Sequence, residues 1–162
     1  MDSSLCRESL AALISQETSA LDELAGLLEH EHSLLVSNDV EALDRAMQRR
    51  QDTMGRLLRI EEERRNLCTM HGRSADVAGL EALLAWCDSA GTLKARWAEC
   101  AQRAMRCREL NDRNGALVFA RMKRVETLLA TLTGQGGERP ATYGPKGAYA
   151  STQTGRVLAA EA

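Results

Sequence analysis

The residues best suited to chemistry lie near position 30, where Glu29 and His32 form a Glu-x-x-His pair. This spacing places both side chains on one face of a helix, and such pairs ligate iron in carboxylate-bridged helical bundles. A complete site needs a second pair of this kind, but the residue three before His71 is Cys68. The sequence therefore predicts histidines at the rim of a helix or in water, and no metal or other cofactor.

No other catalytic pattern is present in the sequence. It has no glycine-rich phosphate loop, no His-Glu-x-x-His motif and no nucleophile elbow. The cysteines are odd in number and show no Cys-x-x-Cys spacing, which argues against a disulfide framework or a zinc site; they are Cys6, Cys68, Cys87, Cys100 and Cys107. We expect these thiols to serve as small apolar core residues. Because no catalytic pattern is found, we also expect that the protein has no catalytic residues and is not an enzyme.

The elements that must position any site are helical. Hydrophobic residues make up 44% of the 162 residues but aromatic residues only 3%, so Leu, Ala, Met and Cys must fill a single core. These residues favour helices over strands, because strands prefer aromatic and β-branched side chains. Apolar residues recur at helical spacing over residues 5–36, in a heptad seam interrupted by Glu17 and Glu31.

A second helix is predicted from a capping box formed by Asn38 and Glu41, and it continues to about Met70. Its inward residues are predicted to be Val40, Leu43, Met47, Met54, Leu57, Leu58, Leu67 and Cys68. The short turn before it predicts that the first two helices are antiparallel. A third helical pattern follows, and Gly91 leaves two alternatives open: helices over 77–88 and 90–133, or one bent helix.

These elements predict an all-α fold, an elongated antiparallel bundle of three long helices with a flexible C-terminal tail. The bundle domain is expected over residues 1–133. Residues 134–162 hold six of the twelve glycines and both prolines, and this composition predicts a flexible, partner-binding tail.

Charge is distributed unevenly along the chain. Residues 1–36 carry one Arg against seven acids, whereas residues 71–133 carry ten bases against seven acids. We expect these two segments to pair. The overall charge of −2 argues against nucleic-acid binding. No apolar run is long enough to span a bilayer and no signal peptide is evident, which predicts a cytoplasmic location without membrane insertion.

Three features favour contact with another protein. Asn111 and Asn114 occupy seam positions of the third helix, where they either fix register or contact a partner. Val118 continues the same stripe. The tail carries scattered apolar groups that are either inert or fold upon a partner; these are Tyr143, Tyr149, Val157 and Leu158.

The sequence resembles the FlgN-like flagellar export chaperones. The resemblance rests on residues 21–35, 38–43 and 60–65, on the Asn-x-x-Asn-Gly motif at 111–115, and on Tyr-Gly-Pro-x-Gly at 143–147. It departs from the family at 48–51, Gln-Arg-Arg-Gln, where members often carry a Lys-centred stretch. The resemblance implies a cytoplasmic protein that binds the hook–filament junction proteins FlgK and FlgL, prevents their early assembly and delivers them to the type III export gate. The alternative is an adaptor coiled coil that self-associates as a homo-oligomer.

Overall fold

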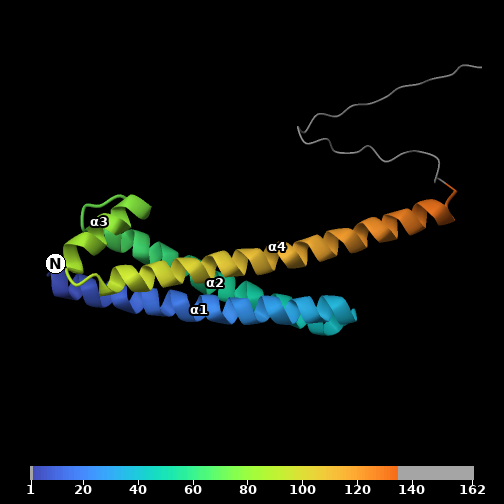
Figure 1. The fold of residues 1–162 in the computed structure, drawn as a ribbon, viewed down its shortest axis with the longest axis horizontal. Helices are drawn as coiled ribbons and strands as arrows, with labels where there is room; N and C mark the ends of the chain where they lie inside the picture. Colours follow the sequence, from blue (N-terminus) through green and yellow to red (C-terminus); the bar gives the residue numbers. More distant parts are fainter. Residues whose placement is uncertain (1, 135–162) are drawn as a thin grey trace, which may run out of the picture. The chain divides into compact units, whose positions relative to one another are not determined.

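The computed structural model describes residues 2–134, and over this range it contains four α-helices (Figure 1). They are α1 (Ser3–Ser37), α2 (Val40–Met70), α3 (Val77–Cys87) and α4 (Thr92–Leu132). The expected all-α class is confirmed for these residues. The count of three helices needs correction, because α3 is a separate short helix between two long ones.

The break between α3 and α4 is made by Asp88 and Gly91. The Asp88 carboxylate accepts hydrogen bonds from the backbone N–H groups of Leu93 and Lys94, at 2.7 and 3.1 Å. These groups belong to the first turn of α4, where N–H groups have no partner within the helix. Gly91 has a φ of 70°, which glycine adopts at little cost. Of the two alternatives, the structure therefore has the two separate helices.

The turn between α1 and α2 depends on two adjacent residues. Asn38 has a φ of 61°, and its backbone N–H donates to the Leu34 carbonyl, so it ends α1. The Asp39 carboxylate accepts from the Ala42 N–H at 3.0 Å and so begins α2. The prediction that Asn38 caps the second helix is thus wrong by one position, because the cap is Asp39. Asn tolerates the left-handed conformation well, which makes it suitable for the end of the first helix.

The chain divides into two compact units, Met1–Ala120 and Arg121–Ala162, and α4 contributes residues to both. In the first unit α1 and α2 are antiparallel, since Glu17 faces Arg64 and Glu31 faces Arg50. The first part of α4 runs parallel to α1, as Figure 1 shows, with Asn114 bonded to the Leu28 carbonyl. The expected boundary between residues 133 and 134 stays a prediction, because the structure describes nothing beyond residue 134.

The core of the first unit is formed mainly by leucine and cysteine. Leu10, Ile14, Leu28, Leu80 and Leu83 are among its most deeply buried side chains. All five cysteines are buried, which confirms their prediction as small core residues.

The buried seam of α2 differs from the predicted one. It consists of residues at intervals of seven, namely Ala46, Thr53, Ile60 and Leu67. Leu67 and Cys68 are buried as expected, but four residues predicted to point inward are 40–69% exposed; these are Val40, Met47, Met54 and Leu58. The prediction followed large apolar side chains, whereas two of the four buried seam positions are occupied by the smaller Ala46 and Thr53.

Candidate partner-binding surface

The second unit carries an exposed apolar stripe on α4. Met122, Val125, Leu129 and Leu132 follow one another at steps of three, four and three residues, so they lie on one face of the helix. Their exposed fractions are 58, 55, 55 and 82%, respectively, and the adjacent Leu128 is 57% exposed. We call these five residues the α4 stripe. An exposed row of large apolar side chains of this kind is typical of a surface that binds another helix.

The residues that flank the α4 stripe are mainly basic. Over residues 121–134 the chain carries Arg121, Lys123 and Arg124 against the single acid Glu126. Long basic side chains keep their charged ends in water beside an apolar surface. The stripe therefore favours a partner helix whose apolar face is bordered by carboxylates.

The predicted asparagine sites lie in the first unit, in different surroundings. Asn111 is exposed, and its Oδ1 accepts a hydrogen bond from Arg50 at 3.4 Å. Asn114 is only 4% exposed; its Nδ2 donates to the Leu28 carbonyl at 2.8 Å, and its Oδ1 lies 3.1 Å from His32 Nδ1. Asn114 thus joins α4 to α1 inside the bundle. Contact of either asparagine with a partner stays a prediction.

The remaining predicted contact residues divide between the first unit and the undescribed part of the chain. Val118 belongs to the first unit and is 42% exposed. Tyr143, Tyr149, Val157 and Leu158 lie outside the residues that the structure describes.

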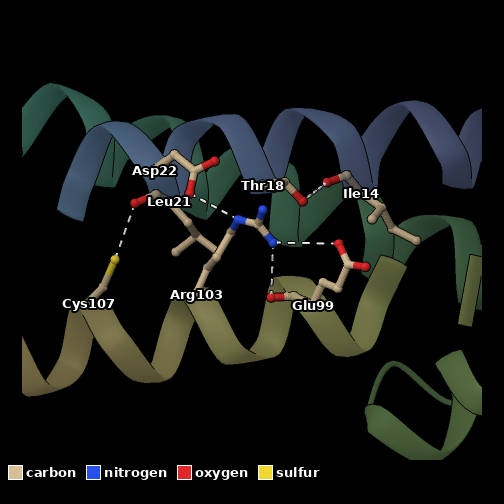
Figure 2. A network of polar contacts seen from close by, with 7 residues as sticks. All are labelled: Ile14, Thr18, Leu21, Asp22, Glu99, Arg103 and Cys107. Atoms are coloured by element: carbon tan, nitrogen blue, oxygen red, sulfur yellow. Dashed lines mark hydrogen bonds and ion pairs between the residues drawn. The ribbon is translucent and has the colours of Figure 1, made fainter. Parts of the chain in front are cut away.

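The contact between α1 and α4 explains how the first part of α4 is held. Figure 2 shows Arg103 between the two helices: its Nε lies 3.0 Å from Asp22 of α1, and its Nη1 lies 3.8 Å from Glu99 of α4. One turn further on, the Cys107 thiol donates to the Leu21 carbonyl at 3.3 Å. The predicted pairing of the acidic first segment with the basic third segment is thus confirmed by these contacts.

The two residues of the Glu-x-x-His pair bind different partners on α4. Glu29 accepts a hydrogen bond from Arg106 at 2.6 Å, whereas His32 faces Asn114. Among residues 2–134 no group of three or more His, Cys, Asp or Glu side chains is arranged to hold a metal ion. The pair therefore serves the contact between α1 and α4.

The buried thiols are poor nucleophiles. Burial, together with the neighbouring Cys87, raises the pKa of Cys6 to about 11. Burial also raises the pKa of Cys100 and of Cys107 above the ordinary value. Since the thiolate is the reactive form, these cysteines are inert at neutral pH.

A hollow of about 510 Å³ lies between α3 and α4, with Leu84, Asp88, Lys94 and Trp97 in its lining. The Asp88 carboxylate there is already bonded to the first turn of α4.

The part of the chain that the structure describes includes no helix with both the length and the apolar character needed to cross a bilayer.

Comparison with known proteins identifies a family. A family model described as FlgN protein matches residues 1–151. No curated protein matches the chain. No solved structure matches it either.

Proposed function

Since the chain belongs to the FlgN family, whose members are flagellar export chaperones, we propose that its clients are the hook–filament junction proteins FlgK and FlgL. In this proposal the protein binds the terminal helices of each client, prevents them from assembling early and delivers the client to the type III export gate. The observation that carries the proposal is the α4 stripe. It offers five large apolar side chains, each more than half exposed, on one helix.

The physical basis is packing of one helix against another. Client helices that later form coiled coils expose an apolar stripe, and such stripes associate readily with each other before assembly. The α4 stripe has the heptad steps that such a helix requires. Met122 adds a flexible side chain that adapts to different client surfaces. A single chaperone is thereby able to accept two clients with unlike sequences.

A substitution in the stripe tests this proposal. We expect Leu129→Glu to weaken capture of purified FlgK and FlgL at least about tenfold, because a carboxylate would be buried against apolar client side chains. Met105→Glu is the matched control, since Met105 also lies on α4 and is 64% exposed but is outside the stripe. Equal capture by both variants, measured by isothermal titration calorimetry, would reject the stripe as the client site.

The tail contribution is tested separately. In this proposal Tyr143, Tyr149, Val157 and Leu158 add contacts with the client, together with the exposed Asn111 and Val118. Asn114, which is buried between α4 and α1, supports that surface from within the bundle. Deletion of residues 134–162 is expected to preserve the helical circular-dichroism signal and the melting temperature while weakening client capture. Undiminished capture would remove the tail from the site.

Self-association through the same stripe is the competing function, because heptad steps also suit a second copy of the chain. Sedimentation velocity separates the two. If the chain is a chaperone, FlgK should compete with any second copy for the stripe, so adding FlgK should separate a dimer into monomers bound to the client. If the chain is an adaptor coiled coil, its dimer should be stable and insensitive to FlgK.

A further inference from the structure

Over residues 2–134 three ion pairs join α1 and α2. The Glu23–Arg56 pair is exposed, and the two more buried pairs lie at a regular interval. Glu17 Oε2 lies 3.5 Å from Arg64 Nε, and Glu31 Oε2 lies 3.2 Å from Arg50 Nη1. The two glutamates are fourteen residues apart on α1, and the two arginines are fourteen apart on α2. Midway between the pairs, Leu24 belongs to a core cluster against which Leu57 packs. Each pair therefore replaces an apolar contact in an otherwise regular antiparallel seam.

The carboxylates of both pairs are largely withdrawn from water. The Glu31 side chain is 4% exposed, and the side chains of Glu17 and Arg64 are 15 and 14% exposed. Burial raises the pKa of Glu31 and of Glu17, while Arg50 and Arg64 respectively oppose this effect. Buried carboxylates without a cation are strongly destabilising.

The first part of α4 contacts both arginines. The Arg64 guanidinium lies 4.5 Å from the centre of the Trp97 ring. Arg50 Nη1, which binds Glu31, also donates to Asn111 at 3.4 Å. Both arginines are held by a third helix, which limits their freedom to follow a displaced carboxylate.

We infer that the Glu17–Arg64 and Glu31–Arg50 pairs determine which helix pairs with α1, and in which register. A shift of α2 by one heptad places Glu17 opposite Leu57 and Glu31 opposite Leu43, so leucine replaces the arginine that faces each carboxylate in the seam. The opposite shift places Glu31 against Leu57. A shift by two heptads keeps a single pair. The register of the structure keeps both pairs.

The same charges exclude a foreign helix. This step depends on the proposed function, in which the clients are helices with uncharged apolar seams. Such a helix in the place of α2 would leave Glu17 and Glu31 buried without cations, so the seam rejects it. The chaperone thus keeps its own bundle closed to the helices that it binds elsewhere.

The full-length chain with Glu17, Arg64, Glu31 and Arg50 all changed to Leu tests this inference. Buried ion pairs are often replaced by apolar residues without loss of stability, so this variant should remain helical. We expect its self-association constant, measured by sedimentation equilibrium, to rise at least about tenfold over the wild type. Hydrogen exchange of α1 and α2 should become bimodal, as expected for mixed registers. A variant with the wild-type association constant and a single exchange pattern would overturn the inference.

The charge-exchanged chain, Glu17→Arg/Glu31→Arg/Arg50→Glu/Arg64→Glu, is the matched control. It keeps both pairs with reversed polarity, so we expect the wild-type association state and a single exchange pattern. Should the four-leucine chain fail to fold, the double substitution Glu31→Leu/Arg50→Leu provides the same two measurements with one pair retained. The double substitution should change the association constant and the exchange pattern in the same direction as the four-leucine chain, but to a smaller extent. The inference would be contradicted if neither measurement changed.

Client capture keeps this result separate from the proposed function. Capture of FlgK by the charge-exchanged chain should equal that of the wild type, because the α4 stripe is unchanged. If the wild type itself captures no client, the proposed function fails, whereas the association and exchange measurements still decide whether the pairs select the register.

Discussion

The seam of α2 and the stripe of α4 have the same heptad spacing but different surroundings. In the first unit, Ala46, Thr53, Ile60 and Leu67 recur every seven residues and are at most 7% exposed. In the second unit, the five residues of the α4 stripe are at least 55% exposed, although all five are apolar and none is as small as Ala46. Spacing therefore indicates which residues share a face, but the size and apolar character of a residue do not indicate whether that face is covered. The covered seam holds the bundle together, and the exposed stripe is available to a partner.

The largest effect on the free energy of unfolding should come from replacing a leucine by alanine in the core of the first unit, and the same replacement in the α4 stripe should have little effect. Leu28 is 2% exposed and packs in a core cluster, so Leu28→Ala should lower the free energy of unfolding by about 2–5 kcal/mol. Leu129→Ala should change it by less than about 0.5 kcal/mol, because Leu129 is already exposed. Urea unfolding followed by circular dichroism measures both. Equal losses of unfolding free energy would contradict the assignment of Leu28 to a buried core and of Leu129 to an exposed surface.

The next effect concerns the charges within the covered region. Arg50→Leu leaves the buried Glu31 without its cation and should lower the free energy of unfolding by about 2–4 kcal/mol at pH 7. The loss is large because the Glu31 side chain is buried and the Arg50 side chain is only partly exposed. The exposed Arg59 provides the control, and Arg59→Leu should have little effect.

The same variant has a defined pH dependence. Burial raises the folded-state pKa of Glu31 above its ordinary value of 4.5, so the folded state binds this proton more readily than the unfolded state. The loss caused by Arg50→Leu should therefore shrink as the pH falls from 7 toward 4.5, because protonated Glu31 needs no cation. A loss that stays constant over this range would contradict the assignment of the effect to Glu31.

A smaller effect is expected at the junction that begins α4. Burial alone would raise the pKa of Asp88, but hydrogen bonds from Lys94, Leu93 and Thr92 together lower it below 3.8. A lowered carboxyl pKa contributes stability that is present above 3.8 and is lost as the pH falls through the folded-state value. Asp88→Asn should therefore lower the melting temperature by a few degrees at pH 7. The difference from the wild type should disappear in acid, as differential scanning calorimetry would show.

Much of the fold follows from the sequence, because its signals are local. Heptad spacing predicts the long helices, and the acidic α1 predicts a basic partner in α4, as the contact between Asp22 and Arg103 confirms. The break near Gly91 was an open alternative, since a glycine within a helix is tolerated at a cost of about 1 kcal/mol. The Asp88 carboxylate decides it by capping α4, and that role depends on the three-dimensional path of residues 88–94.

The candidate site follows from the sequence only in part. The sequence singles out Val118, whose contact with a partner stays a prediction, and it gives Met122 to Leu132 no role beyond the helical pattern, because a sequence does not show which stripe lacks a partner. The opposite error occurred on α2, where Met47 and Met54 were assigned to the interior. Small residues such as Ala46 carry little hydrophobic signal, although they permit the closest approach of two helices.

The central claim is that the α4 stripe binds the client. Hydrogen–deuterium exchange of the full-length chain, with and without purified FlgK, tests it most directly. The account predicts that FlgK slows exchange of the backbone amides of residues 121–132. Slowing confined to residues 2–120, with exchange of the α4 stripe unchanged, would contradict it.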